Sequence, residues 1–595
     1  MWPFPLSSRW TVLVGVIFLE AVGGNPYAFS VFAPQLQKLF NWSQAQISSV
    51  GATGNIGIYL CLDAGFFFDA NGPLKTALGG SILSLMGYAI LWAAATGSLG
   101  GSAESPSPSV SVVSVGAFIF NHGAGWIDTV AVTTAVKAFP NDRGLIVGLL
   151  KSFFGLSGSL VTLCYASFFK PNVVSFIFFL TILVPGVSLV SAFLMRTVPE
   201  NEASIFLTLF ERKKLISSCI GVLLIASYVA AIGVLESQNL LSPQPLLAGL
   251  LVPLLLGQIF ITWPDEKKTK KEAIEIGTEM STPMINSEKN EDFDLIQESN
   301  STVKHTSGGA SFIHSFLSLD LWLLCFVFFA GTGAGLTLIN NLGALTKVLG
   351  ASADGQDVYV ILLSVSNCLG RLLVGVFSDA FSKRISRPWI FLYCVLVMIC
   401  GQVTLAFADL NSLYLGVILT GFAYGSFWSI GPSLVADRFG VKNFASLYNV
   451  VTIWTSAASY IFSSAMVSAF YTARSDLGSS SCSYGILCFR DSFLTLAGVC
   501  SVSAVLCILL AIRLKGLYNP ATGKVRPYSE WKLLDPEGRS SKLAIWANIT
   551  LRPLCCCACG RALLDEEQDD DNSNEFEGDI MKNFIGQTEE KDDEF

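Results

Sequence analysis

The amino-acid sequence predicts an all-helical protein that crosses a membrane many times, built as two six-helix bundles with two extra spans between them. Hydrophobic residues make up 52% of the 595 residues and charged residues 14%, which is too apolar for a soluble chain of this length. The pattern Gly-x-Phe-x-Asp-Ala ends two long apolar runs, at residues 65–70 and 375–380. Two copies of one turn indicate two related halves.

The spans are apolar runs that can cross roughly 30 Å of hydrocarbon at about 1.5 Å per residue. Six occur early, at residues 10–33, 47–68, 75–95, 111–136, 144–169 and 173–195. Two shorter runs follow, at 215–235 and 246–263. Six more occur late, at 321–343, 357–378, 388–408, 413–437, 443–470 and 493–514. We therefore expect fourteen spans.

Lysine and arginine placement supports this count. With a cytosolic N-terminus, most basic residues fall in the inner loops, as the positive-inside rule requires. These are Lys75, Lys137, Arg143, Arg196, Arg212, Lys213, Lys214, Lys383, Arg384, Arg387, Arg438 and Lys442. A single crossing in place of the middle pair would invert the second half. The pair could also be re-entrant or dip in from the cytosolic side, since its second member is short and contains Pro253.

Five regions follow from this reading. They are a first bundle at 1–200, the extra spans at 201–263, a cytosolic loop at 264–318, a second bundle at 319–515 and a cytosolic acidic tail at 516–595. The loop is rich in Lys, Glu, Ser, Thr and Asn, and this composition predicts disorder. Much of the net charge of -8 comes from the tail. The first apolar run lacks a cleavage pattern, so we expect it to act as an uncleaved start signal.

The fifteen cysteines suggest two modifications. Cys482 and Cys488 share an outer loop, where an oxidising compartment would permit a disulfide. The tail contains a cluster close to the last span, which consists of Cys555, Cys556, Cys557 and Cys559. We interpret this cluster as a palmitoylation site or as unmodified thiols, because no histidine accompanies it to suggest a metal site.

Charged residues inside spans usually face an interior pathway, because charge is expensive in hydrocarbon. One group falls roughly 9 to 12 Å inside the cytosolic face, namely Asp63, Asp128, Lys151 and Arg371. Asp128 and Lys151 lie at similar depth on consecutive helices, so we expect an ion pair. The group predicts a cytosolic gate, with a permanent structural ion pair as the alternative. Further gate candidates are Gly65, Asp69, Arg143, Gly375, Asp379, Lys383 and Arg384.

A second layer falls near mid-bilayer and predicts a substrate or proton site. Glu20 precedes two glycines and a proline, which would loosen the first helix and free carbonyl groups. The first span of the second half is also rich in glycine, at Gly331-Thr332-Gly333-Ala334-Gly335. We therefore expect the first helix of each half to be weakened. Glu20 or His122 could carry a coupling proton, and His122 could instead be a packing residue. The candidates are Glu20, Asn25, Tyr27, His122, Asn340 and Asn367.

Several of these motifs resemble those of a known protein family. The doubled Gly-xxx-Asp turn, followed in the second half by Lys383-Arg384, resembles the loop signature of the major facilitator superfamily, although the first copy lacks a basic residue directly after Asp69. Residues 139–144 with Gly148 and Lys151 resemble the nodulin-like branch, which is similar to monocarboxylate-transporter-like proteins. The resemblance covers most of residues 9–514. It implies two bundles around a central cavity and rocker-switch alternating access.

Two functions remain open at this point. The first is a secondary transporter of a small solute, an organic anion such as a monocarboxylate or an amino acid, coupled to protons. The second is a transporter-like sensor or scaffold that signals through the cytosolic loop and tail. An enzyme is not indicated, because the sequence lacks a nucleotide-binding loop, a nucleophile constellation and metal-ligand spacing. We expect a monomer without cofactor or nucleic acid, in the plasma membrane or an endolysosomal or vacuolar membrane, with both termini cytosolic.

Overall fold

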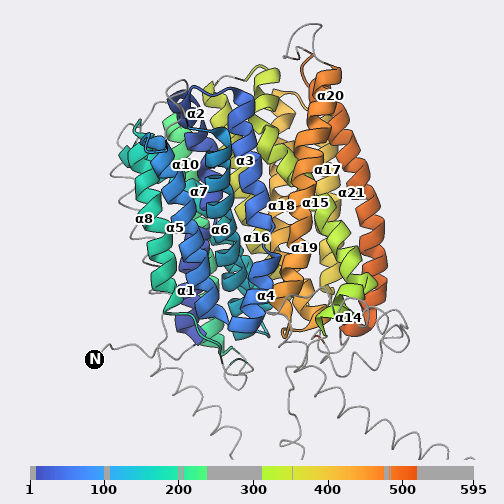
Figure 1. Ribbon diagram of the computed structural model, residues 1–595. Coiled ribbons are helices and arrows are strands. Elements are labelled where there is room, and N and C mark those ends of the chain that lie inside the picture. The colour runs from blue at the N-terminus through green and yellow to red at the C-terminus, as the bar shows by residue number, and fades with distance from the viewer. Residues whose placement is uncertain are drawn as a thin grey trace, which may run out of the picture.

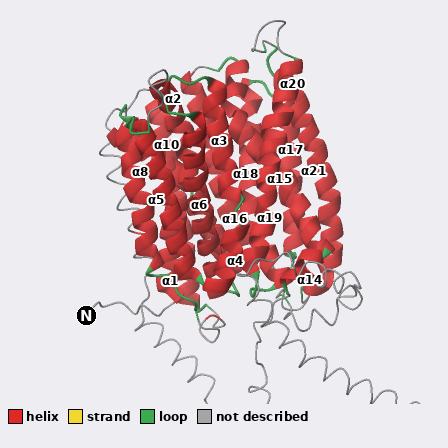
Figure 2. Ribbon diagram, viewed as in Figure 1, coloured by secondary structure: helices red, strands yellow, loops and turns green. Residues whose placement is uncertain are grey.

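The chain folds into a bundle of long helices that run side by side. The computed structural model describes residues 9–99, 108–169, 171–198, 203, 207–237, 257, 311–351, 353–382, 384–474, 482, 484–518 and 525. Within these residues nearly all of the chain is helical, and the loops lie at the two ends of the bundle (Figure 2). We call the end at which α1 begins the α1 end (Figure 1).

The first half begins with a broken helix. It consists of α1 (Arg9–Gly23), the short 3-10 helix η1 (Asn25–Ala28) and α2 (Phe29–Phe40). The remaining helices of this half are α3 (Gln44–Tyr59), α4 (Leu62–Asn71), α5 (Pro73–Ala95), α6 (Val110–Ala138), α7 (Arg143–Cys164) with the π-helical turn η2 (Tyr165–Phe169), and α8 (Val173–Ala192). α3 and α4 form one span that is interrupted at Leu60 and Cys61.

The second half follows after α10 (Leu209–Ser237). Its helices are α14 (Phe312–Leu317), α15 (Leu319–Val348), α16 (Ala353–Ala380), α17 (Arg387–Ala406), α18 (Leu410–Phe439), α19 (Phe444–Ala458) continued by the π-helical η3 (Ser459–Met466) and α20 (Val467–Ala473), and α21 (Leu487–Arg513) with η4 (Leu514–Leu517). In Figure 1 the two halves stand beside each other.

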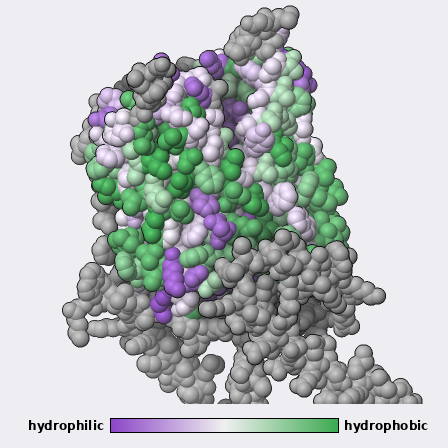
Figure 3. Space-filling model, in the orientation of Figure 1, coloured by the Kyte–Doolittle hydropathy of each residue, from purple (hydrophilic) through white to green (hydrophobic). Residues whose placement is uncertain are grey.

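The span expectation is largely met. Among the described residues, twelve helices are long and apolar enough to cross a membrane, one of them contributed by α10. The broken helix α1–η1–α2 also runs from one end of the bundle to the other (Figure 1), although each of its pieces is short. Apolar side chains cover much of the flank between the two ends (Figure 3). The protein is therefore a multi-pass membrane protein. The run at 246–263, apart from Gly257, most of the loop expected at 264–318 and the cysteine cluster of the tail lie outside the described residues. The described end of that loop, which was expected to be disordered, instead forms the short helix α14.

The expected weakening of both opening helices is correct for the first half and wrong for the second. α1 ends at Gly23, and Pro26 lies in the 3-10 turn that follows. α15 instead continues without a break through its glycines. An added Cβ at Gly331 or Gly335 would overlap the rings of Phe427 or Tyr424. These glycines make room for aromatic side chains of α18, and the backbone hydrogen bonds of the helix stay intact.

Glycines also allow the two halves to approach closely at the α1 end. Gly144 and Gly148 of α7 lie against Gly375 of α16, and small residues of this kind let helix backbones approach closely. A Cβ at Gly375 would overlap the carbonyl oxygen of Gly144 and lie 2.7 Å from the Cα of Gly148. On the other side of the interface, Gly65 of α4 faces the backbone of Ala445 in α19. Both turns therefore lie at contacts between the halves.

Replacing Gly375 by alanine should destabilise the protein, because the new methyl group meets the backbone of α7. The matched control is Gly498→Ala in α21, where an added Cβ has no neighbour within 4 Å. In the control, alanine should stabilise the helix by about 0.5–1 kcal/mol. Thermal unfolding of the purified variants measures the difference. Equal melting temperatures for the two variants would contradict the close contact between α7 and α16.

Candidate functional site

A central pocket lies between the two halves, where helices of both contribute to its wall. Its lining residues are Tyr27, Ile58, Tyr59, Gly125, Asp128, Lys151, Phe154, Arg371, Trp428, Asn449 and Thr452. Two hydrogen bonds join the halves beside the pocket. Asn449 Nδ2 donates to Thr129 Oγ1 at 3.1 Å, and the Ser456 hydroxyl donates to the Ile56 carbonyl oxygen at 3.4 Å. The pocket thus lies at the boundary between the two halves.

An ion pair forms one side of the pocket. Lys151 Nζ donates to Asp128 Oδ1, which confirms the pair expected from the sequence. The Tyr448 hydroxyl, from the second half, donates to Asp128 Oδ2 at 3.0 Å. The ammonium group of Lys151 also lies 5.1 Å from the ring centre of Phe154 and 5.6 Å from that of Trp428, within the range of cation–π attraction. Both halves therefore hold this pair.

Arg371 brings a second cation into the pocket. Its Nε donates to Asn367 Oδ1 at 3.0 Å, and its Nη1 donates to the carbonyl oxygen of Lys151 at 2.8 Å. Nη2 is buried and makes no hydrogen bond among the described residues. No carboxylate of the described residues forms a salt bridge with Arg371. The guanidinium group thus keeps donor capacity for an acceptor that enters the pocket.

Glu20 adds a second carboxyl group close to these charges. Its side chain is fully buried, and neither of its oxygens has a hydrogen-bond partner within the described structure. It lies within electrostatic reach of Lys151, Asp128 and Arg371. Two carboxyl groups and two cations therefore share this region of the protein.

Tyrosines complete the wall of the pocket. The Tyr27 and Tyr59 hydroxyls each lie 3.5 Å from the hydroxyl of Tyr424, so three phenols from three elements meet. The sequence prediction named only Tyr27 among them. Tyr59 and Tyr424 could not be singled out, because nothing in their local sequence distinguishes a tyrosine that faces the pocket from one that faces lipid.

Of the six mid-bilayer candidates, only Tyr27 belongs to the lining of the pocket, and the other five lie outside it, namely Glu20, Asn25, His122, Asn340 and Asn367. Asn25 donates to the carbonyl oxygen of Val22 at 2.6 Å and accepts from Tyr88, so it holds the break in the first helix. Asn340 donates to Ser463 Oγ at 2.8 Å, between α15 and η3. Asn367 accepts from Arg371 and orients it.

His122, the other candidate, lies at the interruption between α3 and α4. One imidazole nitrogen, Nδ1, is 3.1 Å from the carbonyl oxygen of Gly57, in the last turn of α3. The other, Nε2, is 3.0 Å from Asp63 Oδ2 in the first turn of α4. Trp126 Nε1 donates to the same Asp63 oxygen at 3.2 Å. His122 therefore bridges the interruption between α3 and α4, by contacting Gly57 on one side and Asp63 on the other.

The predicted inner charge layer is divided in the structure. Asp128, Lys151 and Arg371 line the pocket together with Tyr27. Asp63 is separate from them, because its side chain pairs with His122 and is 54% exposed. The depth estimate from helix rise could not separate these positions, since it measures distance along a helix and not the direction in which a side chain points.

The two turn aspartates hold helix starts across the interface. Asp379 Oδ1 accepts from the amide of Gly144 at 3.2 Å and Asp379 Oδ2 from that of Leu145 at 2.7 Å, both at the start of α7. Asp69 Oδ2 accepts from the amide of Ser446 at 2.9 Å, at the start of α19. A helix N-terminus favours a carboxylate, because its first amides are unpaired and its dipole is positive there. We call these two contacts the latches.

The basic residues that pair with the two latch aspartates are not the ones that follow the motifs most closely in the sequence. Asp379 pairs with Arg387 at 2.5 Å. Arg384 is exposed and forms no salt bridge among the described residues, and Lys383 lies outside them. The Asp69 carboxylate lies 3.7 Å from Lys137 Nζ. The partners come from neighbouring loops, and distance along the sequence does not reveal them.

A carboxylate that the sequence prediction missed joins the halves at the same end. Asp437, near the end of α18, accepts from Arg143 Nη1 at 3.1 Å and from Arg387. The Tyr518 hydroxyl donates to it at 3.0 Å. Burial and the nearby Asp437 carboxylate raise the pKa of the Tyr518 phenol well above its ordinary value, so the hydroxyl keeps its proton. An Asp-Arg pair at the end of an apolar run was the signal available in the sequence.

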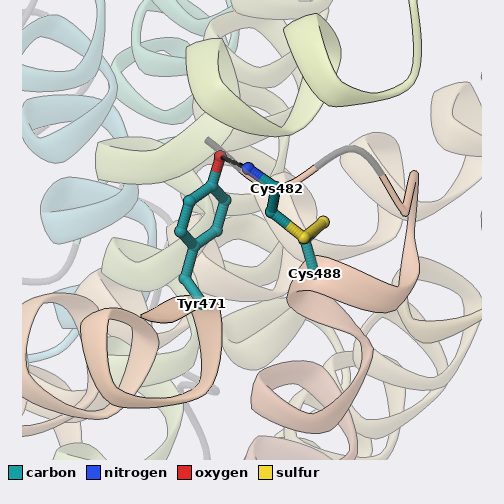
Figure 4. Close-up of a disulfide and its surroundings, with 3 residues drawn as sticks. All are labelled: Tyr471, Cys482 and Cys488. Carbon is teal, nitrogen blue, oxygen red and sulfur yellow. Dashed lines mark hydrogen bonds between the residues drawn. A yellow bond between two sulfur atoms is a disulfide. The ribbon is translucent and has the colours of Figure 1, made fainter. Parts of the chain in front are cut away.

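A disulfide joins Cys482 and Cys488, as their shared outer loop suggested (Figure 4). The backbone amide of Cys482 donates to the Tyr471 hydroxyl at 3.2 Å. Tyr471 lies in α20, Cys482 lies in the connection that follows it, and Cys488 lies in the first turn of α21, at the end of the bundle opposite the latches. The disulfide therefore closes the connection between the last two spans.

Comparison with known proteins agrees with this architecture. The family described as "Nodulin-like" matches residues 9–263, and the family described as "NFD4, C-terminal domain" matches residues 312–519. The chain belongs to the nodulin-like branch of the major facilitator superfamily. In this branch it is 22% identical over 568 residues to Protein NUCLEAR FUSION DEFECTIVE 4 of Arabidopsis thaliana, covering 89% of this chain and 93% of that protein.

A shorter match joins it to a yeast protein. It is 31% identical over 157 residues to the probable transporter MCH1 of Saccharomyces cerevisiae, covering 24% of this chain and 32% of that protein. Among solved structures, the human organic anion transporter MFSD10 has a TM-score of 0.51 at 14% identity, covering 84% of this chain and 99% of that one. The proton:xylose symporter XylE also has a TM-score of 0.51 at 14% identity, and this match covers 88% of this chain and 98% of that one. These two structures establish the fold.

Removing the buried lysine should strongly destabilise the bundle. Lys151→Met leaves Asp128 buried without its cation, which costs about 3–5 kcal/mol. Lys151→Met combined with Asp128→Asn should recover most of the stability, because no uncompensated charge remains at the pair. Thermal unfolding of both purified variants gives the comparison. If the double variant unfolds no later than the single one, the two side chains do not act as a pair.

Proposed function

We propose that this transporter of the major facilitator superfamily moves a small organic anion, such as a monocarboxylate, together with a proton, by alternating access. The observation that carries the proposal is the charge set of the pocket. Among the described residues, Arg371 has a buried donor nitrogen without a hydrogen-bond partner, and the cavity that it lines also contains Asp128, Lys151, Tyr27 and Tyr59. A carboxylate fits such a donor, because charge-assisted hydrogen bonds to arginine are strong and directional.

Charge balance explains the coupling to protons. Glu20 and Asp128 together carry two negative charges when ionised, and Lys151 and Arg371 carry two positive ones. An incoming monovalent anion would leave the buried set with a net negative charge, which is costly in a low-dielectric interior. Protonation of one carboxyl group restores neutrality. One proton per monovalent anion is therefore the favoured stoichiometry, and Glu20, which has no hydrogen-bond partner among the described residues, is the preferred carrier.

In this proposal, making and breaking the two latches closes and opens the α1 end. With the helix starts of α7 and α19 bound to Asp379 and Asp69, the α1 end is closed. In this proposal the halves rock about the pocket, the latches break and the α1 end opens. Because the basic residues gather at this end of the sequence-predicted topology, we infer that it faces the cytosol, with both termini on the same side.

A reconstitution assay tests the function. Purified protein in liposomes should accumulate lactate or pyruvate when an inward proton gradient is applied, and should take up glycerol no faster than empty liposomes. Arg371→Gln should abolish uptake, since the anion loses its donor. The matched control is Arg474→Gln, which removes the cation of an exposed pair with Asp491 away from the pocket and should keep uptake near the parent rate.

The same assay identifies the proton carrier. Glu20→Gln should retain exchange of anion across the membrane while losing stimulation by the proton gradient, because the amide cannot take up a proton. Unchanged pH dependence in Glu20→Gln would remove Glu20 from this role. Absence of uptake for anions, neutral solutes and amino acids alike would favour the sensor or scaffold function.

A further inference from the structure

The chain does not leave the bundle when its last span ends. After α21, the short helix η4 turns beneath the second half, with Leu514 and Leu517 buried at 2% and 1% exposure. Tyr518 follows at 8% exposure and forms an isolated antiparallel bridge with Val525. Lys515 and Gly516, between the two leucines, are exposed. The segment therefore packs one face, formed by Leu514, Leu517 and Tyr518, against the α1 end.

Tyr518 reaches the centre of the contacts between the halves. Its hydroxyl donates to Asp437 Oδ2 at 3.0 Å. Asp437 is bound to Arg387, and Arg387 in turn binds Asp379 at 2.5 Å. Asp379 holds the amides at the start of α7. A continuous chain of hydrogen bonds thus runs from the residue after the last span to a latch.

The three donors to Asp437 come from parts that move differently when the halves separate. Arg143 belongs to the first half, whereas Arg387 and Tyr518 belong to the second. The Asp437 side chain is only 1% exposed, so it depends on these donors. When the α1 end opens, Arg143 departs with α7. Asp437 is then left with one cation, which is shared with Asp379, and one hydroxyl.

Hydrogen bonds to one carboxylate compete, so the loss of one donor strengthens the contribution of those that remain. The Tyr518 bond is therefore worth less while Arg143 is bound and more after Arg143 has left. We propose that Tyr518 is a positioning residue for alternating access, whose hydroxyl supports Asp437 in the open state and so lowers the free energy needed to open the α1 end. The proposal rests on the separation of the halves described under the proposed function.

Hydrogen exchange of the latch amides measures this directly. The amides of Gly144 and Leu145 exchange with solvent when Asp379 releases them, so their exchange rate reports opening and requires no substrate. Tyr518→Phe should slow their exchange by about threefold, because the open state loses more than the closed state. A merely structural role predicts the opposite sign, since weakened packing speeds exchange.

Two further variants make the result decisive. Tyr359→Phe removes a buried hydroxyl that donates to the Leu410 carbonyl oxygen, away from Asp437, and should leave the Gly144 and Leu145 amides unchanged. In an Arg143→Leu background, Asp437 has the same donors in both states, so the effect of Tyr518→Phe should vanish. Faster or unchanged exchange in Tyr518→Phe, or slowing that persists with Arg143→Leu, overturns the proposal. Because no transport is measured, this outcome is independent of whether an anion is carried.

Discussion

The contact of Asp379 with the start of α7 is the interaction on which the closed end of this protein depends. Two backbone amides that no helix can satisfy internally meet a carboxylate from the other half. Membrane helices gain little from the hydrophobic effect when they associate, because lipid is as apolar as the side chains that it would replace. Polar contacts and close backbone packing therefore decide which faces of the halves stay together. Asp69 and the start of α19 repeat the arrangement on the other side of the interface.

The apolar surroundings of the membrane also constrain the charges of the pocket. Its charges cannot be solvated by hydrocarbon, so they are balanced against one another across the two halves. Tyr448 and Arg371 belong to the second half, while Asp128, Lys151 and Glu20 belong to the first. Any change in the charge of the pocket, by a proton or by an anion, therefore changes the energy of the interface. In the proposed transport cycle, this dependence links what the pocket holds to which end is open.

Asp437 extends the link beyond the membrane spans. Because the segment after α21 donates to it, the position of residues 514–518 and the state of the α1 end are parts of one network. Asp320 repeats this pattern nearby, since it binds Arg438 of α18 and Arg513 at the end of α21. The start of α15 and the end of the last span are thus fixed to the same end of α18.

The sequence by itself determined the membrane class, the two halves, nearly all span positions and the Asp128–Lys151 pair, and it identified Cys482 and Cys488 as a bridge that an oxidising compartment would permit. Span length is set by bilayer thickness, and both pairs lie on neighbouring segments, so a one-dimensional pattern was sufficient. Only the tertiary structure decided that α15 is unbroken, that His122 clasps a helix break outside the pocket, and that Arg387, Asp437 and Tyr518 complete the α1 end. These outcomes depend on the rotation of each helix and on contacts between residues up to a few hundred positions apart, which local sequence does not encode.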